Sequence, residues 1–197
     1  FLGGFWLEKY PELVKKIARE GHEIGNHTYS HPHLNSLGRE EIRNELMKTH
    51  EMIKTLTGKD AKVFRPPFGE YSNKVIEVAK ECGYETIIWS IDSLDWQDLS
   101  AQEMVSRVMG KMHNGAIVLF HNNGTHTLEA LNTIIPELLR QGYKIVPISE
   151  LIYKDNYYIH PHTGEQRRIE KPLPEGGRKD EGEVGDKARK KRSGPGI

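Results

Sequence analysis

The sequence predicts a parallel α/β fold, either a closed barrel or an open sheet. Short apolar runs alternate with helical patterns about six times along the chain, and this alternation is typical of repeated strand–helix units. Two runs, residues 84–91 and 116–120, are almost continuously apolar. Such runs are expected of parallel strands that are covered on both faces.

The expected elements follow from the period of the apolar residues and from the residues that flank each run. Strands, or parts of strands, are expected at residues 1–5, 22–25, 62–65, 84–91, 116–120 and 144–147. Helices are expected at residues 8–20, 36–56, 72–83, 100–113, 126–141 and 149–153.

Three serines and four glycines support the helix limits. Serine is a preferred N-cap, and it stands before three of the helical patterns, at Ser36, Ser72 and Ser100. Glycine can adopt the left-handed conformation that ends a helix, and it follows four of them, at Gly21, Gly58, Gly83 and Gly142. Pro11 lies in a first turn, where proline is tolerated.

Length and composition suit one domain with a polar tail. The chain has 197 residues, of which 36% are hydrophobic, and its formal net charge is zero. The charge gives no indication of nucleic acid or an anionic membrane as a partner, and no apolar run reaches the ~20 residues of a membrane span. The single cysteine, Cys82, excludes an internal disulfide and is expected in the core.

The two ends of the chain differ from its centre. Residue 1 is Phe rather than Met, and FLGGFW resembles the end of a buried strand. We therefore expect an N-terminally incomplete fragment of a domain that covers residues 1–153. Residues 154–197 are rich in Gly, Pro and charged residues, so we expect a disordered tail. Its ARKKR run could contact an anionic polymer, although a solvated tail is favoured.

The histidine-rich stretch HEIGNHTYSHPH contains a candidate metal site. His27 and His31 are four residues apart, and two imidazoles at this spacing can bind one ion. Pro32 follows them and favours a loop over a helix, because the residue before a proline avoids the helical region. The helical HExxH zinc motif does not fit, since Thr28 takes the place of its glutamate. Solvated loop histidines are the alternative for His27 and His31, and His33 is expected to be one.

Other polar residues end or follow the next predicted strands. Arg65 comes directly before two prolines. Asp92 and Asp95 belong to the segment DSLDW, which ends at Trp96. His121 directly follows an apolar strand. In parallel α/β folds, functional residues gather at the carboxyl ends of the strands. Arg65 could instead form a surface ion pair. Asp92 and Asp95 could be turn or helix-cap residues, and His121 could be a structural histidine.

The motifs HTYSH, RPPFG, DSLDW and LFH, in this order, resemble those of the polysaccharide deacetylases, the NodB-homology domain of carbohydrate esterase family 4. The resemblance covers roughly residues 1–153. It implies a distorted (β/α) barrel, here without its first strand, and removal of acetyl groups from N-acetylated sugars of peptidoglycan or chitin-like polymers. It also implies a location in the cell envelope or outside the cell.

The resemblance implies a role for each motif. His27 and His31 match the metal-ligand histidines, usually for Zn²⁺ and sometimes for Co²⁺ or Ni²⁺. Arg65 matches the arginine that orients a catalytic-base aspartate. His121 matches the catalytic histidine, a general acid that protonates the leaving amine, and Asp95 the aspartate that tunes it.

The remaining matches concern the substrate groove. Pro67, Phe68 and Gly69 match a groove lining in which the backbone N–H of Phe68 helps to hold the oxyanion. Trp96 matches a groove wall, and Leu119 matches the apolar contact for the acetyl methyl group.

One family motif is missing from the sequence. The family's first strand carries Thr-Phe-Asp-Asp-Gly, whose aspartates are the base and the third metal ligand, and nothing here matches it. A site of two histidines without a carboxylate should bind metal weakly. We therefore expect weak activity, or none, from this chain alone. A non-catalytic sugar-binding relative and a different metal-dependent amidase on the same fold are the alternatives.

Overall fold

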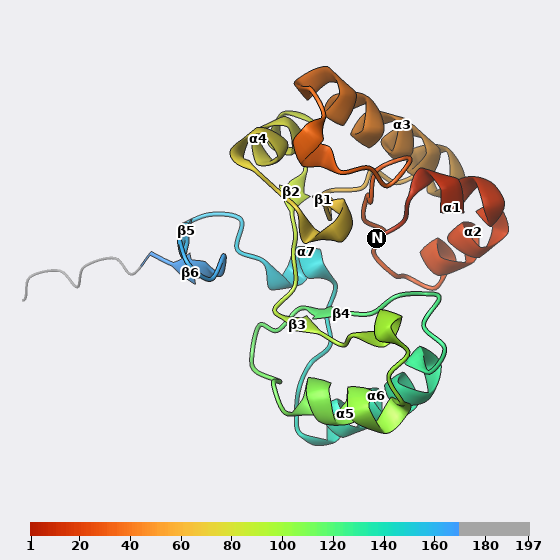
Figure 1. Cartoon of the computed structure of the whole chain (residues 1–197), viewed down its shortest axis with the longest axis vertical. Helices are drawn as coiled ribbons and strands as arrows, with labels where there is room; N and C mark the ends of the chain where they lie inside the picture. The colour runs from red at the N-terminus through yellow and green to blue at the C-terminus, as the bar shows by residue number, and fades with distance from the viewer. Residues whose placement is uncertain (170–197) are drawn as a thin grey trace, which may run out of the picture. The chain divides into compact units, whose positions relative to one another are not determined.

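The computed structural model describes residues 1–169, which fall into two compact units, the first Phe1–Ile152 and the second beginning at Tyr153. The first unit contains the helices and the parallel strands (Figure 1). Its α-helices are α1 (Gly4–Lys9), α2 (Pro11–Arg19), α3 (Arg39–Thr57), α4 (Asn73–Glu81), α5 (Ala101–Met109), α6 (Thr127–Arg140) and α7 (Ile148–Leu151). Three 3₁₀ turns are η1 (Leu34–Ser36), η2 (Pro67–Gly69) and η3 (Asp95–Gln97).

Parallel strands lie between the helices. β1 (Val63–Phe64) pairs with β2 (Glu85–Thr86), and β3 (Ile91–Asp92) pairs with β4 (Val118–Leu119). Isolated parallel β-bridges also pair Leu2 with Asn26, and Asn26 with Phe64. Four segments therefore lie side by side in the order Leu2, Asn26, β1, β2, as predicted for a parallel α/β fold.

Two apolar clusters form the core of the first unit. One packs α1–α4 around β1, with Leu46, Phe64 and Val75 almost fully buried. The other packs α5 and α6 against β3 and β4, with Met104 and Ile134 almost fully buried. Figure 1 shows α3 and α4 beside β1 and β2, and α5 and α6 beside β3 and β4.

The strands are shorter than predicted. The single strand expected at residues 84–91 is two strands, because the chain changes partner: Ile87 N–H donates to Phe64 O, and Ser90 N–H donates to Ile117 O. Residues 22–25 form no strand, only the neighbouring bridge at Asn26. No strand is assigned at residues 144–147, where Ile145 is 55% exposed.

Several helix limits also differ from the prediction. The helix expected at residues 8–20 is two helices, α1 and α2, because Tyr10 precedes a proline and leaves the helical region (φ −132°, ψ 51°). Ser72 and Ser100 cap α4 and α5 as predicted. Ser36 does not cap α3; its hydroxyl donates to His33 O, and α3 begins after Gly38.

The second unit contains an antiparallel hairpin where the sequence predicted a disordered tail. β5 (Tyr157–Ile159) pairs with β6 (Gln166–Arg168). Aromatic residues at 157 and 158 favour a strand, and Gly164, with φ +70°, lies in the turn. The ARKKR run lies outside the described residues. Within residues 1–169, no helix has the length and apolar content that a membrane crossing requires.

Candidate active site

The two imidazoles of the HTYSH loop lie close together, edge to face. The ring centroids of His27 and His31 are 4.9 Å apart, with the planes at 72°. Nδ1 of His27 lies 2.7 Å from the carbonyl oxygen of Arg65. Because a carbonyl can only accept, Nδ1 carries the hydrogen and Nε2 keeps a free lone pair.

Both histidines are neutral near pH 7. Burial lowers the pKa of His27 to about 4. Burial also lowers the pKa of His31, and the nearby imidazoles of His33 and His121 lower it further. His31 and His121, which come from loops 90 positions apart in the sequence, are therefore close enough for their charges to interact.

This donor set fits two of the ligands of a zinc ion. Neutral imidazole nitrogens are ordinary Zn²⁺ ligands, and a hydrogen bond from the other ring nitrogen to a carbonyl is their usual support. Within residues 1–169, no group of three His, Cys, Asp or Glu side chains could hold a metal ion. A third ligand of these side-chain types is therefore not supplied by the described residues.

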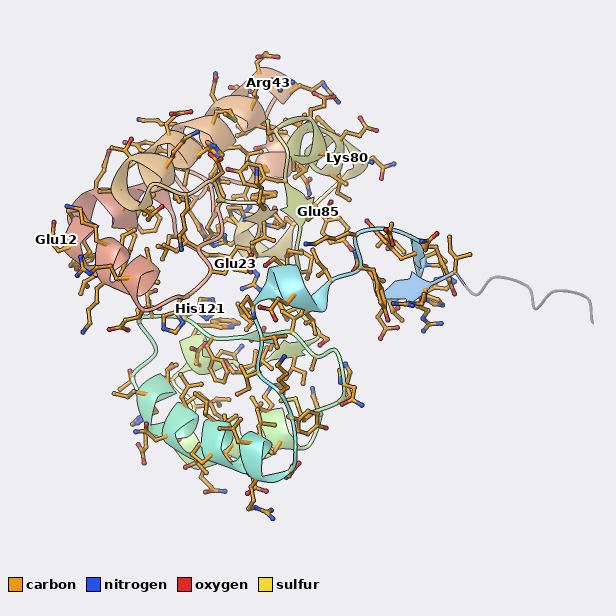
Figure 2. All side chains as sticks on the ribbon, turned by 180° about the vertical axis from the view of Figure 1, so that it is seen from behind. Glu12, Glu23, Arg43, Lys80, Glu85 and His121 are labelled. Atoms are coloured by element: carbon orange, nitrogen blue, oxygen red, sulfur yellow. The ribbon has the colours of Figure 1, made fainter. Side chains whose placement is uncertain are left out.

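Asp95 and His121 form a second, tightly bonded pair. Oδ1 of Asp95 lies 2.7 Å from Nδ1 of His121, and Oδ2 accepts the backbone N–H of His121 at 2.6 Å. Burial by itself raises the pKa of Asp95, but hydrogen bonds from His121 and Thr127 outweigh it and hold the pKa below its usual value. His121 Nδ1–H is thus fixed, and its Nε2 is left for a substrate. Figure 2 labels His121 on the loop after β4.

Two residues that the sequence analysis missed, Thr127 and Gly124, hold the Asp95 carboxylate in place. The Thr127 hydroxyl donates to Oδ2 of Asp95 at 2.8 Å. A Cβ on Gly124 would lie 2.1 Å from the Thr127 hydroxyl oxygen and 3.1 Å from Oδ2 of Asp95, so only glycine leaves room there. Asp92, the other candidate carboxylate, instead accepts the N–H of Leu94 in a local turn.

Arg65 is buried without a carboxylate partner in the described residues. It is 8% exposed, and its guanidinium lies over the rings of Phe1 (4.1 Å) and Trp89 (5.8 Å). Its Nε has no hydrogen-bond partner in the part of the chain that the structure describes, and burial lowers the pKa of Arg65 to about 10. A buried cation without an anion is costly, which indicates that an anionic group belongs beside it.

The predicted groove residues differ in exposure. Phe68 and Trp96 are 54% and 57% exposed, whereas Leu119 is 6% exposed and Pro67 is buried. The Phe68 ring meets the edge of His31 and stacks on His33 at a centroid distance of 4.2 Å. His33 is exposed, as expected, but it is also ordered by this stack and by a 3.0 Å contact between its Nδ1 and Glu70.

Backbone strain gathers in these same loops. Outside glycine, positive φ occurs at six described residues, namely Thr28, His31, Phe68, Leu94, Asp98 and Asn156. All except Asn156 lie in the HTYSH, RPPFG and DSLDW motifs or within two residues of them. Strained backbone of this kind clusters at functional sites, where the surrounding structure holds it in place.

Asn26 fixes the histidine loop to the protein core by hydrogen bonds. It is fully buried; its Nδ2 donates to Leu46 O at 2.8 Å and to the Tyr84 hydroxyl at 2.9 Å, and its Oδ1 accepts the N–H of Thr28 at 2.9 Å. The sequence analysis assigned no role to Asn26. Its burial depends on α3 and on Tyr84, both distant in sequence.

We expect Asn26→Ala to lower the free energy of unfolding by about 3 kcal/mol, because it leaves buried donors and acceptors without partners. Urea denaturation measures this loss. Asn44→Ala on the exposed face of α3 is the matched control and should stay within about 0.5 kcal/mol of wild type. Equal effects of the two changes would contradict an anchoring role for Asn26.

Comparison with known proteins identifies the family. Residues 1–87 match the family described as Polysaccharide deacetylase. A peptidoglycan-N-acetylglucosamine deacetylase of Bacillus cereus is 38% identical over 157 residues, which cover 77% of this chain and 73% of that protein. This chain belongs to the polysaccharide deacetylase family. Another Bacillus cereus deacetylase of the same name is 39% identical over 77% of this chain, but the match covers only 56% of that protein.

Solved structures agree with the family assignment. The crystal structure of a pseudoenzyme of carbohydrate esterase family 4 from Bacillus anthracis has a TM-score of 0.74 at 40% identity, over 77% of this chain and 53% of that one. A peptidoglycan N-acetylglucosamine deacetylase structure also has a TM-score of 0.74, at 38% identity, over 77% and 72%. The deacetylase-type α/β fold predicted from the sequence is thereby confirmed.

Proposed function

We propose that this polysaccharide deacetylase chain carries most of the active site of an enzyme that removes acetyl groups from N-acetylglucosamine in peptidoglycan. The observation that carries the proposal is the Asp95–His121 pair, whose imidazole is held by the carboxylate and contributes to the lowered pKa of His31. The names of the Bacillus cereus relatives support the substrate. Peptidoglycan as substrate places the protein in the cell envelope or outside the cell.

His27 and His31 would hold a divalent cation, Zn²⁺ in the first place, with Co²⁺ or Ni²⁺ as substitutes. When bound, the ion would supply Lewis-acid polarisation of the acetyl carbonyl and would lower the pKa of a water. The backbone N–H of Phe68 would bind the developing oxyanion. Leu119 offers an apolar contact for the acetyl methyl group, and Trp96 and Pro67–Gly69 line the sugar groove.

His121 would complete the reaction as general acid. Asp95 holds Nδ1–H and stabilises the imidazolium, so Nε2–H can protonate the departing amine. An amine leaves poorly unless it is protonated, which explains why the site needs an acid. The described residues do not supply the catalytic base. Arg65 is buried there beside no carboxylate. It would orient the base, an aspartate of a Thr-Phe-Asp-Asp-Gly strand.

A catalytically impaired sugar-binding relative is the second candidate. Two observations favour it: the printed sequence has no Thr-Phe-Asp-Asp-Gly, and one similar structure is that of a pseudoenzyme. Against it, a binding protein has no need of Arg65, Asp95 and His121 together. Acetate release distinguishes the two candidates when it is measured on a substrate panel.

The panel contains peptidoglycan glycan strands, N-acetylglucosamine oligomers and O-acetylated xylan, each with added Zn²⁺. We expect this chain alone to release little or no acetate from any of them. With a strand that supplies the aspartates, release from the two N-acetylated substrates should exceed release from xylan. Binding of the glycans without any acetate release, even from the extended chain, would instead support the sugar-binding relative.

A further inference from the structure

Hydrogen bonds to side chains hold the backbone of the loop that carries the two histidines. Four consecutive N–H groups, from Thr28 to His31, each donate to a side-chain oxygen. Asn26 accepts the first, Glu45 accepts the next two, and the Thr28 hydroxyl accepts the last at 3.2 Å. Most loops satisfy such groups with water, so this loop is unusually fixed.

Glu45 makes the largest contribution to this arrangement. It is half-buried on α3, and its Oε2 accepts the N–H groups of Tyr29 (2.9 Å) and Ser30 (2.8 Å). Its Oε1 accepts the Ser30 hydroxyl at 2.8 Å. One carboxylate thus binds, by three hydrogen bonds, two of the three residues that separate the histidines, namely the two nearest His31.

These bonds offset a conformational cost. Thr28 and His31 have φ values of 65° and 60°, and the left-handed region is unfavourable for a residue other than glycine. A β-branched threonine is especially disfavoured there. The same two residues determine where the imidazoles of His27 and His31 point. Without Glu45, we expect the loop to relax to ordinary dihedral angles and the rings to separate.

A buried chain of hydrogen bonds supports Asn26 in turn. The Tyr84 hydroxyl accepts from Asn26 and lies 2.7 Å from Nδ1 of His50, whose Nε2 is 3.3 Å from Asp60. Burial raises the pKa of Tyr84 to about 12, so its hydroxyl remains a donor at neutral pH. Asn26 also bonds to Leu46 O, so both supports of the loop are fixed to α3.

We propose that Glu45 and Asn26 are positioning residues that hold the His27–His31 pair in its ion-binding geometry before any ion is present. This inference rests on the proposed metal-dependent function. It goes beyond that function, because it assigns the geometry of the pair to α3 rather than to the ion. Outer partners of metal ligands commonly change metal affinity 10–100-fold when they are replaced.

The test compares Glu45→Ala with Glu45→Gln in this chain. Glutamine keeps an oxygen for the two N–H groups, and its NH₂ can donate to the Ser30 hydroxyl. Co²⁺ absorption and Zn²⁺ calorimetry measure affinity. We expect Glu45→Ala to weaken binding about 10–100-fold and Glu45→Gln to stay within about threefold. Glu51→Ala, at an exposed position on the same helix, is the control and should not alter binding.

A second readout needs no metal. Amide hydrogen exchange at Tyr29 and Ser30 should accelerate in Glu45→Ala and stay close to wild type in Glu45→Gln, while core amides of α3 remain protected in both. Unchanged exchange in Glu45→Ala would overturn the inference. An equal loss of affinity in Glu45→Gln and Glu45→Ala would also overturn it, because charge rather than position would then be responsible.

The two readouts separate this inference from the proposed function. A wild-type chain that binds neither Co²⁺ nor Zn²⁺ would refute metal binding by the histidine pair. Exchange at Tyr29 and Ser30 would still decide whether Glu45 fixes the loop. Metal binding that is equally tight in wild type and Glu45→Ala would leave the metal site standing and refute the positioning role.

Discussion

Joining a strand that bears Thr-Phe-Asp-Asp-Gly ahead of Phe1 is expected to raise acetate release by at least about a hundredfold, the usual contribution of a general base. Two observations define where the strand would lie. Leu2 pairs with the segment Gly25–His27 on one edge, and within residues 1–169 no backbone hydrogen bond reaches its other edge. The Arg65 guanidinium, close to the Phe1 ring, has no carboxylate partner among residues 1–169.

The measurement is acetate release from an N-acetylglucosamine oligomer with Zn²⁺, for this chain and for the extended one. The matched control carries Thr-Phe-Ala-Ala-Gly in the same extension, so that pairing of the strand is kept and only the carboxylates are lost. We expect no gain from the control. An equal gain from both extensions would show that folding, rather than a base and a ligand, had been restored. No gain from either would favour a degenerate relative.

Asp95→Asn is expected to lower kcat of the extended chain by about 10²–10⁴-fold. The asparagine oxygen can replace Oδ2, which accepts from the His121 N–H and from Thr127. Its NH₂ group then faces Nδ1 of His121, which must become an acceptor. The ring proton moves to Nε2, and the imidazolium that should protonate the amine loses its carboxylate.

The ¹⁵N spectrum of His121 in the unextended chain shows this tautomer change without any turnover. Asp98→Asn is the control, because Asp98 is exposed on the same loop and has φ 58°, which asparagine tolerates. We expect it to keep both the tautomer and kcat. A tautomer change in Asp95→Asn with kcat within threefold of the parent would exclude His121 as the general acid.

Asp95→Asn should also change the response of stability to acid. The folded-state pKa of Asp95 lies below the usual value of an aspartate, because His121 and Thr127 hydrogen-bond to its carboxylate. Its carboxylate therefore stabilises the fold above about pH 4, and this contribution is lost as the pH falls through the lower folded-state value. Urea midpoints measured from pH 6 to pH 2 should fall less steeply for Asp95→Asn than for wild type.

The sequence by itself determined the fold class, the order of the elements and the family. Alternating apolar runs and helical patterns predict parallel strands between helices, because burial on both faces demands apolar residues throughout. The motifs around His27, Arg65, Asp95 and His121 predicted which polar residues follow strands. Short-range rules also placed the caps at Ser72 and Ser100, since a cap depends only on residues three positions away.

Only the tertiary structure decided how those residues are held. The change of strand partner between Ile87 and Ser90 depends on two neighbours, Phe64 and Ile117, that local pattern cannot supply. Glu45 reads as an ordinary helix glutamate until its carboxylate is seen to bind Tyr29 and Ser30. Such contacts join positions far apart in the chain, and nothing in the local residue pattern encodes them.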